Sequence, residues 1–189
     1  MKTLMFAAAL ALGATSAFAA EKYVLDSSHS QVVFNYDHIG YSTTFGMFSG
    51  FEGEIMFDEA APDNSSVSVS MPLMSMFTGW EQREAHFMSP DFFGAAEGDL
   101  VTFTSTSIEV TGDNTALITG DLTMNDVTKS VVLDAKLNKA DVHPMAGKPW
   151  MGFDATTTLL RSDFNVGAFA PAVSDAVEVR ISVEAMKAD

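Results

Sequence analysis

The sequence of 189 residues contains no cysteine and few cations. Without cysteine, the chain has no disulfide, no thiolate metal site and no thiol to carry a lipid anchor. Lysine and arginine together number 10 against 25 aspartates and glutamates, which gives a net charge of −15. An acidic surface repels phosphate backbones and anionic bilayers. The composition therefore argues against nucleic acid and anionic membrane surfaces as partners.

The first 19 residues have the pattern of a cleavable secretory signal peptide. Lys2 gives a positive start, Leu4–Leu12 is apolar, and Ala17-Phe18-Ala19 matches an A-x-A cleavage site. The apolar stretch is shorter than the roughly 20 residues of a membrane-spanning helix. We therefore expect residues 1–19 to be removed and residues 20–189 to form one domain, exported to the periplasm.

Apolar and polar residues alternate with a period of two through most of the chain, which is typical of half-buried strands. The clearest hairpin is Ile118–Leu137, where the turn Asn125-Asp126 tolerates a left-handed backbone. One segment, Thr78–Met88, has helical spacing and predicts a short helix. The sequence predicts eight or nine antiparallel strands, near Lys22–Asp26, Ser30–His38, Phe48–Phe57, Ser65–Met71, Leu100–Val110, Ala116–Met124, Val127–Asn138, Trp150–Leu160 and Ala176–Glu184.

The positions that alternate with the apolar ones in these strands carry charged residues such as Glu52, Glu178 and Arg180. Charges facing lipid are costly, so the apolar parity belongs inside a soluble barrel with no stable membrane insertion. A barrel of eight strands either fills itself with side chains or holds one ligand. The sequence has 12 methionines and 15 phenylalanines, and the flexible methionine side chains adapt to variable apolar shapes. Small inward residues, Gly53, Gly120 and Ala155, favour an open interior.

Groups with catalytic or metal-binding spacing are missing from the sequence. The four histidines do not form H-E-x-x-H, and no G-x-S-x-G nucleophile elbow occurs. We therefore expect no catalytic residue, no metal and no cofactor. Arg161 ends an apolar strand, where it either pairs with a nearby carboxylate or carbonyl or contacts a ligand head group. His86 also has two possible roles, as a structural cap or as a contact to a ligand at the mouth of a cavity.

The order and spacing of many short motifs resemble the YceI-like family of periplasmic polyisoprenoid-binding proteins. These motifs are Tyr23-Val-Leu-Asp26, His29-Ser30, His38-Ile-Gly40, Gly46-Met-Phe48, Phe51–Asp58, Thr78-Gly79, Arg83-Glu-Ala-His-Phe87, Ser89-Pro-Asp-Phe-Phe93, Thr102-Phe103, Ser105-Thr106, Gly120-Asp-Leu-Thr123, Val127-Thr-Lys129 and Arg161-Ser-Asp-Phe164. The chain departs from the family pattern at Glu84, Phe87, Asn125-Asp126 and Asn165. We interpret the Asn125-Asp126 turn as a tolerated variant that lies away from the binding site.

The resemblance implies an all-β fold, a lipocalin-like extended eight-stranded antiparallel β-barrel with one short helix. It also implies an apolar tunnel that holds an isoprenoid, a quinone-like molecule or another long-chain lipid as the ligand. Family members act as binding or carrier proteins rather than enzymes. Mouth or lid candidates are Trp80, His86, Phe87 and Arg161. Candidate wall residues are Phe34, Tyr36, Phe51, Phe57, Met71, Phe103, Leu122, Leu133 and Phe153.

Two other functions stay open at this point. A barrel enzyme of the isomerase or cyclase type would need a polar group inside the tunnel, for which Asn35, Tyr36, Asp37 and Thr157 are candidates. A stress-response or electron-transfer partner protein would hold the lipid incidentally. The sequence does not distinguish a monomer from a homodimer.

Overall fold

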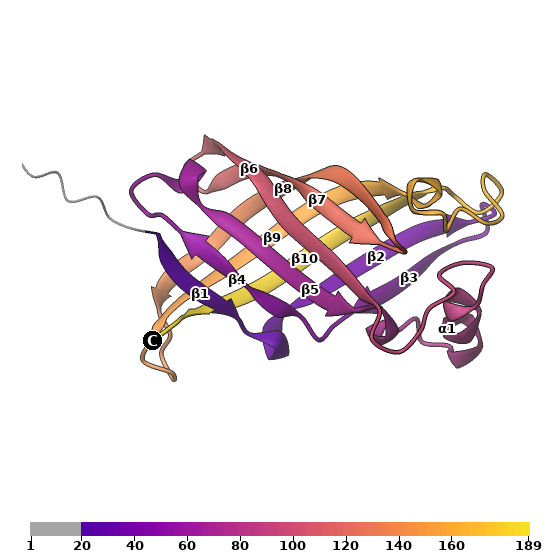
Figure 1. Cartoon of the computed structure of the whole chain (residues 1–189), viewed down its shortest axis with the longest axis horizontal. Helices are drawn as coiled ribbons and strands as arrows, with labels where there is room; N and C mark the ends of the chain where they lie inside the picture. The colour runs from indigo at the N-terminus through magenta and orange to yellow at the C-terminus, as the bar shows by residue number, and fades with distance from the viewer. Residues whose placement is uncertain (1–19) are drawn as a thin grey trace, which may run out of the picture.

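The computed structural model describes residues 20–189, so the predicted signal peptide lies outside the described residues. These residues form one antiparallel sheet that curls into a barrel (Figure 1). Ten strands make it: β1 (Glu21–Leu25), β2 (Gln31–His38), β3 (Ser42–Phe48), β4 (Glu52–Phe57), β5 (Ser66–Pro72), β6 (Leu100–Gly112), β7 (Thr115–Met124), β8 (Val127–Val142), β9 (Pro149–Leu160) and β10 (Ala176–Lys187).

The ten strands occupy eight positions around the barrel, because two positions are each shared by two short strands. β10 pairs with β2 through Glu178–Ser182 and with β1 through Ala185–Lys187, so β1 and β2 lie end to end beside it. β4 pairs with β1, and β3 pairs with β2. The β1–β10 pairing closes the ring. This confirms the predicted eight-stranded antiparallel barrel.

The break between β1 and β2 is held by side-chain hydrogen bonds where the sheet ladder is interrupted. A 3₁₀ turn, η1 (Ser27–His29), occupies the break, and Asp26 caps it by accepting from the Ser28 backbone N–H at 2.9 Å. The buried Ser30 hydroxyl donates to the Asp26 carbonyl at 2.7 Å. Its oxygen also accepts from the Glu184 N–H at 3.4 Å. Ser30 therefore satisfies backbone groups that would otherwise lack partners.

One α-helix, α1 (Glu81–Met88), lies beside one end of the barrel (Figure 1). The predicted short helix is confirmed, although it starts three residues later than expected. Glu84 of this helix accepts from the Thr78 N–H at 2.6 Å, which fixes the approach of the chain to the helix. Glu84, where the chain departs from the family pattern, therefore orders the start of the helical segment. Within residues 20–189, no helix has the length and apolar character needed to cross a membrane.

The strand β3 is the element that the alternation pattern missed, since the predicted strand began only at Phe48. Its inward positions Ser42, Thr44 and Gly46 pair with inward β2 residues but are polar or small, so no apolar stripe marks them. The outer edge of β3 has little support: an isolated bridge joins Met47 to Phe77, with two 2.9 Å hydrogen bonds. The barrel is therefore least closed beside β3.

The hairpin β7–β8 forms as predicted. Asn125 and Asp126 have φ values of 53° and 59°, the left-handed backbone of a two-residue type I′ turn. The strands pair from Met124↔Val127 to Thr115↔Lys136 without a shift of register.

Candidate functional site

The barrel encloses an apolar cavity of about 870 Å³, so its interior is not filled by side chains. This volume lies in the upper part of the range of roughly 300–1,000 Å³ that is typical of ligand pockets. Inward residues such as Val67, Phe153, Ile181 and Val183 line the cavity and stay only half-buried, because one side of each faces open space. All thirteen candidate residues from the sequence line this cavity: Phe34, Tyr36, Phe51, Phe57, Met71, Trp80, His86, Phe87, Phe103, Leu122, Leu133, Phe153 and Arg161.

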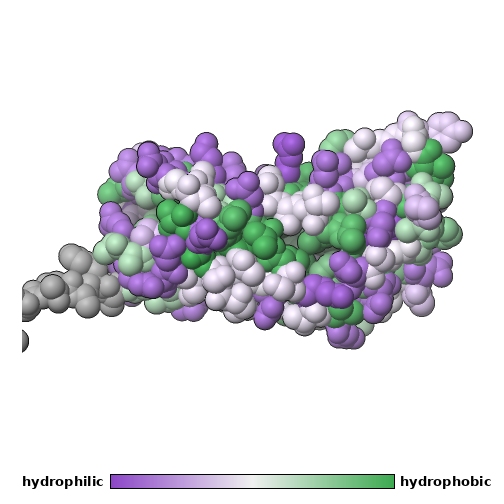
Figure 2. All heavy atoms as spheres, turned by 90° about the horizontal axis from the view of Figure 1, so that it is seen from above, coloured by the Kyte–Doolittle hydropathy of each residue, from purple (hydrophilic) through white to green (hydrophobic). Residues whose placement is uncertain are grey.

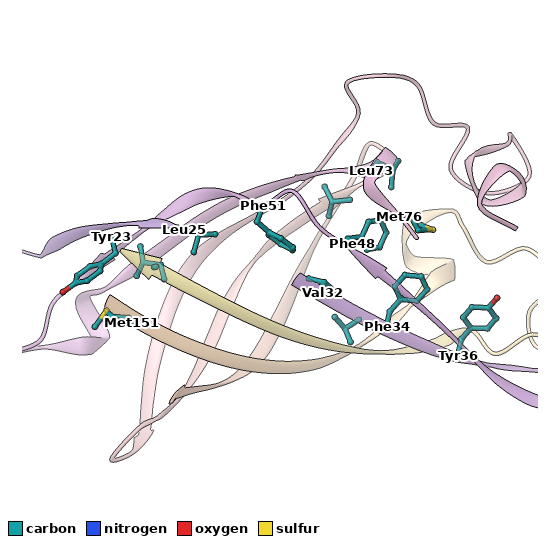
Figure 3. Close-up of a cluster of buried hydrophobic side chains, with 14 residues drawn as sticks. Tyr23, Leu25, Val32, Phe34, Tyr36, Phe48, Phe51, Leu73, Met76 and Met151 are labelled. Carbon is teal, nitrogen blue, oxygen red and sulfur yellow. The ribbon is translucent and has the colours of Figure 1, made fainter. Parts of the chain in front are cut away.

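One end of the barrel is sealed by close packing. Tyr23, Met151 and Ala185 are 6%, 3% and 0% exposed and do not line the cavity. Figure 3 shows Tyr23 and Met151 at one end of the buried cluster and Tyr36 at the other. The Tyr23 ring packs edge-on against Phe57, which does line the cavity, with 6.5 Å between ring centroids. Tyr23 and Met151 therefore form the floor.

The other end is open between α1, the β2–β3 turn and the loop 161–175. Residues that line the cavity and are exposed gather here, among them His38, Trp80 and Phe169. Aromatic rings connect the helix side with the loop: Phe92 lies 5.0 Å from His86 and 6.1 Å from Phe169, measured between ring centroids. These contacts make a partial lid of side chains over the mouth.

Apolar residues also reach the outer surface around this mouth. Figure 2 shows apolar residues among the polar ones on one face of the molecule. Near the mouth, the large exposed apolar side chains include Ile39, Tyr41, Phe45, Phe77 and Phe169.

Arg161 holds the loop 161–175 in place and has few donors left for a ligand. Its Nε donates to the Ser174 carbonyl at 2.9 Å, and NH1 and NH2 donate to the carbonyls of Val166, Ala168 and Val173 at 2.9, 3.1 and 3.0 Å. Four of the five guanidinium N–H groups are thus used. Burial lowers the pKa of Arg161 from its ordinary value, although the nearby Asp175 opposes this. Of the two interpretations of Arg161, the geometry supports the structural one, in which the side chain is held by backbone carbonyls.

His86 lies at the rim of the mouth rather than deep in the cavity. Its Nε2 is 3.3 Å from the Asp91 carboxylate, and its ring packs against Phe92. The side chain is nearly half exposed, at 47%. Its role as a ligand contact stays a prediction.

The small inward residues do not all provide open space, which corrects the sequence interpretation. A Cβ at Gly120 would lie 2.3 Å from the Phe103 ring and 2.6 Å from the Thr104 carbonyl oxygen. A Cβ at Gly53 would lie 2.3 Å from the Ser68 carbonyl oxygen. These two glycines let neighbouring groups approach the backbone closely. Of the three, only Ala155 lines the cavity.

Part of the lining comes from the loop 161–175, which period-two alternation does not mark. Phe164 and Val166 are 1% and 2% exposed and line the cavity. The Arg161-Ser-Asp-Phe164 motif was the available signal for Phe164. Asn125 donates through Nδ2 to the Phe164 carbonyl at 2.9 Å, so the β7–β8 turn supports this part of the site. Neither Asn125 nor Asp126 lines the cavity, but the turn contacts the site indirectly, through the backbone of Phe164.

Polar groups inside the cavity are few. Of the four candidates for an enzyme, Tyr36 and Thr157 line the cavity. Asn35 instead donates to Glu178 at 3.2 Å, and Asp37 is exposed and accepts from the Gly40 N–H at 2.7 Å. Within residues 20–189, neither Tyr36 nor Thr157 is hydrogen-bonded to a general base. These four candidates therefore do not form a paired nucleophile and base.

A group of potential metal ligands lies outside the cavity, at the β1–β2 break. Asp26, His29 and Glu184 bring their ligand atoms within 4.8 Å of one another. Their contacts are already satisfied by protein: His29 Nδ1 lies 2.6 Å from Asp26 Oδ2, and Glu184 accepts from Trp150 Nε1 at 2.7 Å. The cluster is explained by the structure of the break.

Residues 23–185 match the model of the YceI-like domain. The chain belongs to the YceI-like family. It is 40% identical over 186 residues to a UPF0312 protein of Ectopseudomonas mendocina, covering 95% of this chain and 96% of that protein. The crystal structure of the Campylobacter jejuni YceI protein superposes with a TM-score of 0.72 at 29% identity, covering 81% of this chain and 90% of that one.

A third relative is similar in fold alone. A polyisoprenoid-binding domain from Saccharophagus degradans superposes with a TM-score of 0.69 at 14% identity, covering 88% of this chain and 98% of that domain. The family and the barrel inferred from the sequence are thereby confirmed.

Proposed function

We propose that this YceI-like protein binds a long-chain amphipathic lipid, such as a polyisoprenoid, a quinone-like molecule or a fatty chain, and carries it through the periplasm without chemistry of its own. The observation that carries this proposal is the apolar cavity of about 870 Å³, sealed at one end and open at the other. The related domain from Saccharophagus degradans, described as polyisoprenoid-binding, supports it.

The energetics of such binding are favourable. Each buried methylene contributes about 0.8 kcal/mol, so ten methylenes contribute about 8 kcal/mol. A binding free energy of roughly that size corresponds to micromolar affinity, before the costs of ordering the chain are subtracted. A flexible lipid therefore needs little more than the apolar walls to bind usefully.

The direct test is native mass spectrometry and lipid extraction of protein purified from its own host. We expect a long-chain lipid to leave with the protein in about one copy per cavity. Ala155→Trp places an indole in the cavity and should exclude the lipid. Thr156→Trp, at the neighbouring exposed position, is the matched control and should keep it. An empty native protein, or equal loading of the two variants, would contradict the proposal.

A further inference from the structure

The inner face of the β2–β3 pair changes from apolar to polar toward the mouth. Deep in the barrel, Val32 pairs with Phe48 and Phe34 pairs with Gly46. Nearer the mouth, Tyr36 pairs with Thr44 and His38 pairs with Ser42. The last four residues all line the cavity. The cavity therefore has a direction, with an apolar interior and a polar end.

Tyr36 is the polar residue of this face that lies deepest. Its side chain is buried, with the residue 8% exposed, and it lines the cavity. Within residues 20–189 its hydroxyl has no protein hydrogen-bond partner, and no fully enclosed side-chain polar atom is left unsatisfied in this part of the chain. The Tyr36 hydroxyl therefore faces the space of the cavity (Figure 3).

The surroundings of Tyr36 favour an oxygen acceptor as its partner. The Phe87 ring lies 6.2 Å from the Tyr36 ring and shields it from the side of the helix. The Arg161 side chain also lines the cavity, as Tyr36 does. Arg161 uses four of its five N–H groups on carbonyls, whereas the buried Tyr36 hydroxyl faces the cavity and its donor is free within residues 20–189.

We propose that the cavity binds its lipid in one direction, with an oxygen acceptor of the head group hydrogen-bonded to the Tyr36 hydroxyl and the apolar chain pointing toward Met151. This inference rests on the proposed function and adds the chemical class of the head group, a carbonyl or carboxylate oxygen. A hydrocarbon without such an oxygen leaves the hydroxyl without a partner, and that loss discriminates between the two ligands.

The test compares two ligands of equal chain length, 2-tridecanone and n-tridecane, as competitors of the fluorescent apolar probe N-phenyl-1-naphthylamine. Tyr36→Phe removes only the hydroxyl oxygen. It should weaken the ketone by about fivefold to tenfold, as expected for one lost hydrogen bond, and should not weaken the alkane, because the alkane no longer leaves a hydroxyl without a partner. Tyr41→Phe is the matched control, because Tyr41 is 89% exposed and does not line the cavity. Equal weakening of both ligands, or of neither, overturns the proposal.

A second measurement reads the hydrogen bond in the folded wild type. Infrared spectra of bound 2-tridecanone with a ¹³C-labelled carbonyl should show the carbonyl band at lower frequency than for the same ketone in an apolar solvent, in the wild type and in Tyr41→Phe. In Tyr36→Phe protein from which the ketone still displaces the probe, the shift should vanish. An unshifted band in the wild type overturns the proposal while the proposed function stands. If neither tridecanone nor tridecane displaces the probe from the wild type, the proposed function fails, and this inference fails with it.

Discussion

The two ends of the barrel are held by different kinds of interaction. At the floor, strand pairing closes the ring between β1 and β10, and Met151 and Ala185 are almost completely buried. At the mouth, β3 has one isolated bridge on its outer edge, and the loop 161–175 is fixed by the hydrogen bonds of Arg161. The floor is closed by strand pairing and apolar packing, whereas the loop at the mouth adds the hydrogen bonds of Arg161 to its two buried side chains, Phe164 and Val166.

The difference follows from the cavity itself. The loop 161–175 lies above the cavity and buries only two side chains fully, Phe164 and Val166, so apolar burial contributes less to the position of its other residues. Directional hydrogen bonds can order such a loop without filling the space below. Arg161 to four carbonyls, Asn125 to Phe164, and Ser162 to Asp175 at 2.6 Å provide them. A binding barrel can therefore be stable at one end and accessible at the other.

The largest expected effect is at the floor. Met151→Ala removes a side chain that is 3% exposed and leaves a void, so we expect a loss of about 2–5 kcal/mol in the free energy of unfolding. Phe169→Ala at the mouth, where the residue is 60% exposed, should change it by less than about 0.5 kcal/mol. Urea denaturation of both variants measures this. Similar losses in the two variants would remove the distinction between floor and mouth.

At the mouth, we expect the loss of polar contacts to reduce stability most. Arg161→Gln leaves several loop carbonyls without their donor, and we expect a loss of about 2 kcal/mol, concentrated in residues 161–175. Hydrogen exchange resolved by residue should show faster exchange in this loop and little change at β1 and β4. Arg180→Gln, at an exposed position of β10, is the control and should leave both regions unchanged. Uniformly faster exchange in Arg161→Gln would show that the two ends are not independent.

A third prediction concerns the wall between the two ends. Gly120→Ala places a methyl group 2.3 Å from the Phe103 ring and 2.6 Å from a backbone oxygen, so the strand or the ring must shift. We expect a loss of about 1–2 kcal/mol, as for other overpacked cores. Gly152→Ala is the matched control, because its Cβ would meet nothing within 4 Å. Thermal unfolding of the Gly120→Ala and Gly152→Ala variants measures the difference. Equal melting temperatures would show that the Phe103 ring moves freely into the cavity.

Period-two alternation predicted the strands whose inner face is apolar, which is why the floor and most of the wall were readable from the sequence. It failed at β3, because Ser42 and Thr44 face inward as polar residues at the mouth. It also gave no signal for Val166, whose carbonyl accepts a hydrogen bond from Arg161 of the same loop. The mouth is therefore the part of the site that tertiary contacts decide. The end of the apolar strand marks Arg161, and motif resemblance includes Phe164, where periodicity has no information.

The smallest expected effect is a pH dependence of stability at the break between β1 and β2, which lies between the two ends of the barrel. The hydrogen bond to Asp26, followed by attraction to its charge, raises the pKa of His29 above its ordinary value of 6.5. Burial raises the pKa of Asp26, but hydrogen bonds from His29 and Ser28 outweigh it and hold this pKa below 3.8.

The direction of the effect follows from linkage. The contribution of His29 is complete below pH 6.5, its value in the unfolded chain, and is lost as the pH rises through the raised pKa. The contribution of Asp26 is complete above pH 3.8 and is lost as the pH falls through the lowered pKa. The pair therefore stabilises the break most between these limits. An NMR titration should show His29 titrating above 6.5 in the wild type and closer to it in Asp26→Asn. An unchanged midpoint in the variant would mean that Ser30, rather than this ion pair, holds the two halves of the barrel in register.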